Sequence, residues 1–194
     1  MDTQTIILLG PQGSGKGTQS EKLANYLRKE SKKDVLHFET GQSFRQLAKQ
    51  SNWTGKQIRS TIEAGKLQPS FLAVRLWATQ LIDNLDPETH LVLDGSPRRM
   101  LEAKLLSEAL DFYQRENRLV IHLTIDEKTT YERLSNRGRN DDTRESIANR
   151  LAQYRKQTKP VIDHFKQIDN YRCEEVDGKQ SKSMVHDDIC NLLS

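Results

Sequence analysis

The chain has 194 residues, of which 35% are hydrophobic and 29% charged, and its 30 Lys and Arg against 27 Asp and Glu give a net charge of +3. This length suits one compact domain, and the near balance of charge offers no bulk argument for a nucleic-acid partner. No apolar run approaches the roughly 20 residues of a membrane span, no signal peptide is visible, and two cysteines without metal spacing suit a reducing compartment. We therefore expect a cytoplasmic protein that binds neither nucleic acid nor a membrane.

The first predicted elements are a strand, a glycine-rich turn and a helix. The strand is Thr5 to Leu9, the turn runs from Gly10 to Gly15, and the helix extends from Lys16 to about Lys29. Glycines let the backbone wrap an anion, the helix N-terminus adds positive partial charge, and Lys16 can reach the outer phosphates of a nucleotide. The spacing is that of a phosphate-binding loop, except that Gly17 follows the lysine and the hydroxyl comes at Thr18. The alternative is a glycine-rich surface loop, which the flanking strand and helix disfavour.

The remaining elements alternate between strands and helices. Strands are predicted over residues 35–38, 90–93, 119–125 and 171–176, and helices after residue 40, over 55–64, 69–85, 99–114, 126–136 and 182–193, and from residue 142. Gly65 is a candidate left-handed cap, Asp142 and Glu145 have capping-box spacing, and Pro160 interrupts or restarts a helix. This alternation predicts an α/β fold of the P-loop NTPase type, with three layers and a five-stranded parallel sheet covered by helices on both faces. The loops after the first three strands then share one rim.

Charged residues gather in the loops of that rim. Asp94 ends an apolar strand, where nucleotide-binding proteins place a carboxylate for Mg²⁺ or its waters. A plain Asp-Gly turn is the alternative, and a phosphate loop on a neighbouring strand disfavours it. Arg45 and Arg98 can clamp a phosphate with bidentate hydrogen bonds, so we expect a second anion site there.

A further group of arginines follows the fourth strand, at Arg133, Arg137, Arg139 and Arg150. The alternative is a charged hairpin with surface ion pairs to Glu132, Asp141, Asp142 and Glu145. Such pairs contribute typically under ~1 kcal/mol, so a mobile arginine cover over transferring phosphates accounts better for them. No nucleophile or general base with an oriented partner stands out, and phosphoryl transfer needs none. The apolar patterns around Trp53 and Trp77 predict core or covering side chains for both.

Taken together and in order, these residues are typical of a known family. The chain resembles a short-lid adenylate kinase, one of the nucleoside monophosphate kinases, over nearly its whole length. The motifs that carry the resemblance are Gly10–Gln19, Thr40-Gly41 with Arg45, Ala64–Leu67, Asp94–Arg98, Arg133 with Arg137, Arg139 with Asp141-Asp142, Arg150, and Val176–Gly178. The Gly17-Thr18 order is usual in this family.

The resemblance implies reversible phosphoryl transfer from Mg-ATP to a nucleoside monophosphate, with AMP as the default acceptor, by a monomer without zinc. It implies one domain over residues 1–194, with an acceptor-binding insert at about 40–70 and a short lid at about 137–143. The implied ATP site comprises Gly13, Ser14, Gly15, Lys16, Gly17, Thr18, Arg133, Arg137 and Gln180. The implied acceptor site comprises Thr40, Gly41, Arg45, Gln68, Gly95, Arg98 and Glu102. The implied catalytic residues are Lys16, Asp94 (through water on Mg²⁺), Arg98, Arg133, Arg137, Arg139 and Arg150.

Three positions depart from the family pattern. Gln42 and Ser96 replace the usual Asp and Phe, and Glu102 stands where the family usually has a Gln that contacts adenine. A carboxylate only accepts hydrogen bonds, so it cannot donate to adenine N1, but it suits the N–H groups of guanine or the amino group of cytosine. GMP or CMP therefore stays open as the acceptor beside AMP. A nucleotide-binding module with weak turnover is a second alternative, and a P-loop kinase of small metabolites is a third.

Overall fold

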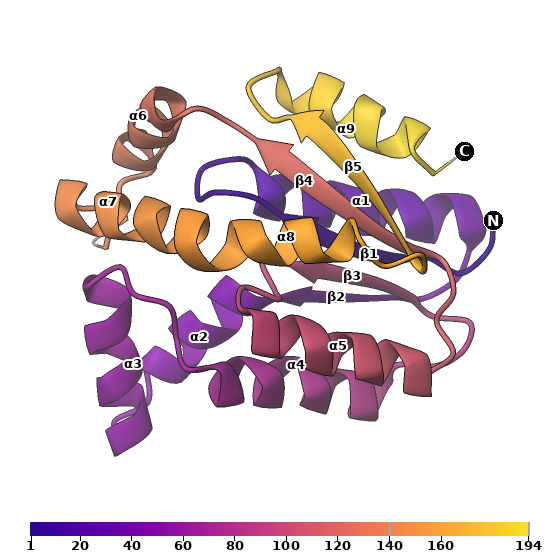
Figure 1. The fold of residues 1–194 in the computed structure, drawn as a ribbon, viewed down its shortest axis with the longest axis horizontal. Coiled ribbons are helices and arrows are strands. Elements are labelled where there is room, and N and C mark those ends of the chain that lie inside the picture. Colours follow the sequence, from indigo (N-terminus) through magenta and orange to yellow (C-terminus); the bar gives the residue numbers. More distant parts are fainter. Residues whose placement is uncertain (140, 194) are drawn as a thin grey trace.

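The computed structural model describes residues 1–139 and 141–193, with a five-stranded sheet at the centre (Figure 1). The strands are β1 (Thr5–Leu9), β2 (Val35–Glu39), β3 (His90–Asp94), β4 (Arg118–Thr124) and β5 (Tyr171–Asp177). They lie in the order β2-β3-β1-β4-β5, and every neighbouring pair is parallel. This confirms the predicted parallel sheet. The loops that follow β1, β2 and β3 therefore meet at one edge.

Helices cover both faces of the sheet, as predicted. Alternate residues of a strand point to opposite faces, so Ile6 and Leu8 of β1 pack with the helices on one face and Ile7 and Leu9 with those on the other. The first face is covered by α1 (Lys16–Ser31) and α9 (Lys182–Asn191). The second is covered by α4 (Ser70–Asn84), α5 (Met100–Phe112) and α8 (Lys159–Phe165) (Figure 1).

Between β2 and α4, two helices form an arm with a small core of its own. They are α2 (Thr40–Ala48) and α3 (Trp53–Glu63), and their apolar residues Phe44, Ala48 and Ile58 pack against Ala73 of α4. Gly65 ends the arm with φ 64°, which confirms the predicted left-handed conformation. A Cβ atom at this position would lie 2.5 Å from the carbonyl oxygen of Ser146, so the close approach of the two segments also requires glycine.

A second hairpin, formed by α6 (Glu127–Arg137) and α7 (Arg144–Gln153), has a small core of Leu134, Ile147 and Leu151. The capping box predicted at Asp142 is wrong. Helix α7 begins one residue later, and the Thr143 hydroxyl caps it by accepting a 3.2 Å hydrogen bond from the N–H of Ser146. The carboxylate of Asp142 is engaged by arginines instead.

Helix α7 continues through a π-helical turn, Tyr154–Thr158, into α8, where Pro160 lies in the first turn. The helix thus restarts around this proline, as predicted.

The two tryptophans differ in burial. Trp77 is 3% exposed and belongs to the core, whereas Trp53 is 73% exposed. The prediction of a core or covering role for Trp53 is therefore wrong, because it is the first residue of α3 and lies outside that helix's apolar stripe. None of the described helices is both long and apolar enough to cross a membrane.

Candidate active site

The conformation of the loop after β1 depends on its glycine residues. Gly10 has φ 145°, and a Cβ atom on it would lie 2.2 Å from the carbonyl oxygen of Leu123, so a side chain cannot be accommodated there. Gly15 has φ 98° and directly precedes Lys16, the first residue of α1. The loop therefore wraps around the N-terminus of a helix, which is a favourable position for the phosphates of a nucleotide.

The side chain of Lys16 folds back over this loop. Its Nζ donates hydrogen bonds of 2.8 Å to each of the carbonyl oxygens of Gly10 and Pro11. Burial lowers the pKa of Lys16 to about 8, an effect that the nearby carboxylate of Asp94 opposes. A bound polyphosphate would favour the charged form of this amine and would replace the loop carbonyls as its partners.

A cleft of about 780 Å³ opens at this edge of the sheet, between the loop, the α2–α3 arm and the α6–α7 hairpin. Of the residues predicted for the site, 18 line it: Gly13, Ser14, Gly15, Lys16, Gly17, Thr18, Thr40, Gly41, Arg45, Gln68, Asp94, Arg98, Glu102, Arg133, Arg137, Arg139, Arg150 and Gln180. Gly95 is placed differently, because it borders a small neighbouring cavity. The structure therefore brings the predicted donor and acceptor residues to one cavity.

Among the residues predicted to bind the acceptor, Arg98 and Glu102 are fixed to each other. The Nε of Arg98 donates to the carbonyl oxygen of Gly95 at 2.6 Å, and its backbone N–H donates to Oε2 of Glu102 at 2.8 Å. The other oxygen of Glu102, which is 2% exposed, accepts from the Ser70 hydroxyl at 3.1 Å. Burial lowers the pKa of Arg98, while the carboxylates of Asp94 and Glu102 raise it. Glu102 is therefore an anchored acceptor of hydrogen bonds at this wall.

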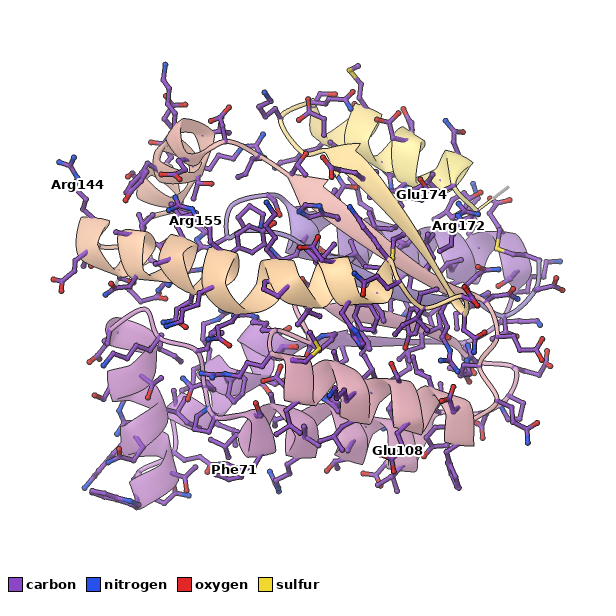
Figure 2. All side chains as sticks on the ribbon, viewed as in Figure 1. Phe71, Glu108, Arg144, Arg155, Arg172 and Glu174 are labelled. Carbon is purple, nitrogen blue, oxygen red and sulfur yellow. The ribbon has the colours of Figure 1, made fainter. Side chains whose placement is uncertain are left out.

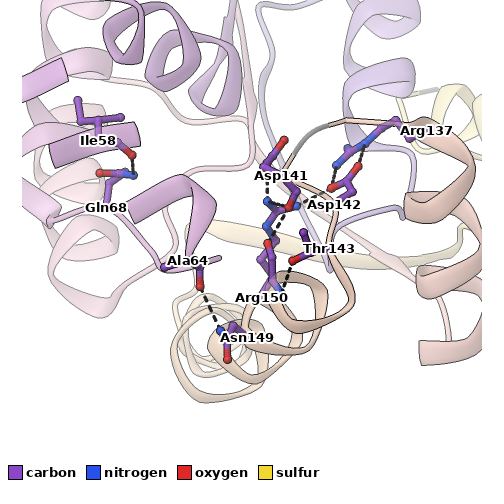
Figure 3. Close-up of polar contacts among 10 residues, drawn as sticks. Ile58, Ala64, Gln68, Arg137, Asp141, Asp142, Thr143, Asn149 and Arg150 are labelled. Atoms are coloured by element: carbon purple, nitrogen blue, oxygen red, sulfur yellow. Dashed lines mark hydrogen bonds and ion pairs between the residues drawn. The ribbon is translucent and has the colours of Figure 1, made fainter. Parts of the chain in front are cut away.

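Gln68 lies at the same wall. Its Nε2 donates to the carbonyl oxygen of Ile58 at 3.4 Å, whereas its buried Oε1 has no partner among the described residues (Figure 3). The hydroxyl of Thr40 is likewise buried without a described partner. Because an unpaired buried polar atom costs free energy, both atoms are candidates to contact a ligand.

Three arginines of the α6–α7 hairpin are held in two different ways. Figure 3 shows Arg137 and Arg150 converging on acidic residues of the connecting loop. Arg137 makes two 2.8 Å bonds to the carboxylate of Asp142, and Arg150 reaches the same carboxylate at 2.7 Å and also pairs with Asp141. Arg133 instead donates to backbone carbonyl oxygens of the donor loop and of the β5–α9 turn.

Two of the ion-pair partners named in the alternative, Asp141 and Asp142, are thus used within the hairpin, and the side chain of Asp142 is only 2% exposed. Arg139 faces the same cleft, and its pKa is lowered by burial and by the positive charges of Arg137 and Arg45. A bound phosphate group would relieve this repulsion between like charges. By contrast, Arg144 in the first turn of α7 points away from the cleft (Figure 2).

Comparison of the sequence with known proteins agrees with this arrangement of the cleft. A sequence profile of the family described as "Adenylate kinase" matches residues 8–170. Curated relatives include "Adenylate kinase" of Corynebacterium diphtheriae, 38% identical over 160 residues (82% of this chain and 84% of that protein), and "Adenylate kinase 1" of Nostoc sp., 34% identical over 180 residues (93% of each). The chain belongs to the adenylate kinase family. The resemblance predicted from the motifs is therefore confirmed.

The three residues of this chain that depart from the usual pattern of the adenylate kinase family lie in different environments. Gln42 is exposed and lies outside the residues that line the cleft. Ser96 is 1% exposed, and its hydroxyl has no partner among the described residues. Glu102 is the departure that lines the cleft, so it is the one positioned to contact a nucleotide.

The sequence-based prediction missed Glu39, the last residue of β2, which also lines the cleft. It pairs in register with Asp94 at the end of the neighbouring strand β3. Burial and the negative charge of Asp94 both raise the pKa of Glu39. The available signal was an acidic residue at the carboxyl end of a predicted parallel strand, one place before the Thr40-Gly41 motif.

Proposed function

We propose that this protein transfers the terminal phosphoryl group of Mg-ATP reversibly to AMP, so that two ADP molecules form. The observation that carries this proposal is that one cleft is lined by the phosphate loop, by Arg45 and Arg98, and by the arginines of the α6–α7 hairpin. A protein that only bound ATP would not need a second arginine-lined wall opposite the donor loop. Membership of the adenylate kinase family supports the same reaction.

We assign the donor nucleotide to the loop side of the cleft. Residues 13–18 would receive its phosphates at the N-terminus of α1, with the amine of Lys16 turning from the loop carbonyls to the phosphate oxygens. Arg133 donates hydrogen bonds to the carbonyl oxygens of both Gly13 and Gly178. With Gln180, it would lie against the nucleoside of the donor. These groups bind and orient the donor, which is most of what phosphoryl transfer requires.

We assign the acceptor to the opposite wall, in an insert of about residues 40–70. Arg45 and Arg98 would hold its phosphate, Thr40 and Gly41 would lie near its nucleoside, and the orphaned oxygen of Gln68 would accept a hydrogen bond from its base. Arg137, Arg139 and Arg150 would gather on the transferring group. The short lid, about residues 137–143, of which residue 140 lies outside the described residues, would carry Arg137 and Arg139 there and exclude water.

The described residues also suit a divalent cation. Among them, no group of three or more His, Cys, Asp or Glu side chains could hold a metal ion alone. Mg²⁺ is instead commonly held by one or two carboxylates together with substrate phosphates. Asp94 lines the cleft beside Gly17, so its carboxylate is available to a cation bound with the phosphates. When bound, Mg²⁺ would neutralise the charge of the phosphates.

Substitution of Arg139 provides the direct test. No hydrogen bond or ion pair of this side chain is recorded within residues 1–139 and 141–193, so Arg139→Ala should fold normally. We expect kcat for ADP formation from ATP and AMP to fall about 10³-fold, the lower range for an arginine that stabilises the transferring group. The matched control is Arg144→Ala, which removes an exposed arginine of the same hairpin. If wild-type protein binds ATP but phosphorylates no monophosphate, the protein is a nucleotide-binding module instead.

A second candidate acceptor is GMP or CMP, and the anchored carboxylate of Glu102 favours it. The test compares kcat/KM for AMP, GMP, CMP and UMP in wild-type protein and in Glu102→Gln. The amide keeps one oxygen for the N–H of Arg98, and its NH2 can donate to the Ser70 hydroxyl, so the wall should stay intact. A shift of preference towards AMP in the variant would identify Glu102 as a base-contacting residue. Unchanged ratios would leave it a positioning residue for Arg98.

A further inference from the structure

Glu39 is a charged residue in the cleft that the proposed roles leave without a function. It ends β2, lines the cleft, and lies opposite Asp94 in the β2–β3 register. No ion pair of Glu39 is formed within the described part of the chain. Glu39 is half-buried, and its charge is repelled by the carboxylate of Asp94 and attracted by the guanidinium groups of Arg45 and Arg139.

The two carboxylates face one empty volume at the start of α1. A Cβ atom on Gly17 would lie 3.4 Å from Oδ2 of Asp94 and 3.9 Å from Oε2 of Glu39. In the general phosphate-binding loop the residue after the lysine carries a hydroxyl that binds Mg²⁺. Here the hydroxyl comes one residue later, at Thr18, and two carboxylate oxygens lie beside the glycine that follows the lysine.

An independent observation comes from Thr40, the residue after Glu39. Its side chain is 2% exposed and lines the same cleft, yet its hydroxyl has no hydrogen-bond partner among the described residues. A buried hydroxyl without a partner indicates that a water or ligand atom belongs beside it. The end of β2 therefore presents both a charge and a hydrogen-bonding group that the protein itself leaves unsatisfied.

We propose that Glu39 is a second carboxylate of the magnesium site, and that with Asp94 it holds the water molecules of the Mg²⁺ that accompanies the donor nucleotide. The proposal rests on the proposed function, because the phosphates of ATP supply the remaining ligands. Mg²⁺ retains several waters and binds through one or two carboxylates together with substrate phosphates. In this assignment Glu39 acts on the cation rather than on the acceptor.

Metal binding can be measured without turnover. Mn²⁺ is titrated into the protein saturated with adenylyl imidodiphosphate, an ATP analogue with a nonhydrolysable terminal linkage, and free Mn²⁺ is followed by electron paramagnetic resonance. We expect Glu39→Gln to weaken Mn²⁺ binding to this complex about tenfold, as is typical when an outer-shell ligand partner is removed. Binding of the analogue without metal should change less than twofold. Glu39→Asp should recover part of the loss, since it keeps the carboxylate.

The matched control is Glu21→Gln, which removes an exposed negative charge of α1 that also lines the cleft and whose field reaches Glu39. If this control weakens Mn²⁺ binding as much as Glu39→Gln, or if Glu39→Gln stays within twofold of wild type, the proposal is wrong. A changed KM for AMP with unchanged Mn²⁺ affinity would also overturn it, because Glu39 would then serve the acceptor. If wild-type protein does not phosphorylate AMP while Mn²⁺ affinity still depends on Glu39, the proposed function fails and the metal assignment stands.

Discussion

The two sides of the cleft are built by different means. On the donor side, backbone geometry sets the site: Gly10 packs against the carbonyl of Leu123, and Lys16 is held by carbonyl oxygens of its own loop. On the lid side, side chains hold other side chains, because Arg137 and Arg150 are oriented by Asp142. A backbone-built site is fixed before a ligand arrives. A site built from ion pairs can be rearranged by a competing phosphate, which suits the lid role that we propose for this hairpin.

The largest effect should come from the positively charged side chain of the phosphate loop. Lys16→Met keeps the length and the apolar stem but removes the positive charge. We expect kcat to fall about 10³-fold, in the range found for the loss of one preorganised charge-stabilising group. Circular dichroism and Tm should stay close to wild type, because the loop geometry is set by glycines. Lys29→Met on the exposed surface of the same helix is the control. A kcat within tenfold of wild type would contradict the assignment of Lys16.

A smaller effect is expected on the lid side, where a single substitution should disturb two arginines together. Asp142→Asn removes the charge and leaves one acceptor oxygen for Arg137 and Arg150. Loss of charge-assisted hydrogen bonds at this carboxylate should cost about 2 kcal/mol of the local stability of the α6–α7 hairpin, measured as faster hydrogen exchange at residues 144–147, because the hairpin has a core of its own. Misplaced arginines should lower kcat about tenfold.

The same variant tests the difference between the two sides. The Kd of adenylyl imidodiphosphate should change less than threefold, since the donor loop does not depend on Asp142. Glu132→Gln, at an exposed position of α6, provides the control for lost charge. If the analogue binds much more weakly to Asp142→Asn than to this control, the two sides are coupled and the comparison fails.

This contrast also explains what could be predicted from the sequence. The strands, the sheet and the donor loop follow from local patterns, because glycine positions and apolar runs encode them directly. Local spacing could not decide between Asp142 and Thr143 as the cap of α7, since both residues are good caps and distant arginines compete for one of them. Glu39 was missed for a related reason, because its significance lies in its register with Asp94, which exists only in the folded sheet.

The smallest predicted effect concerns that cap. Thr143→Ala removes the acceptor for the N–H of Ser146, which should cost about 1 kcal/mol. If the lid unfolds together with the sheet, this loss should lower Tm by roughly 2–4 °C. If the lid opens by itself, Tm should stay constant while hydrogen exchange at residues 144–147 accelerates about fivefold. We expect the second result, because the hairpin has a core of its own. Thr143→Ser, which keeps the hydroxyl, should restore wild-type exchange, and a Tm loss without faster local exchange would show that the lid and the sheet form one cooperative unit.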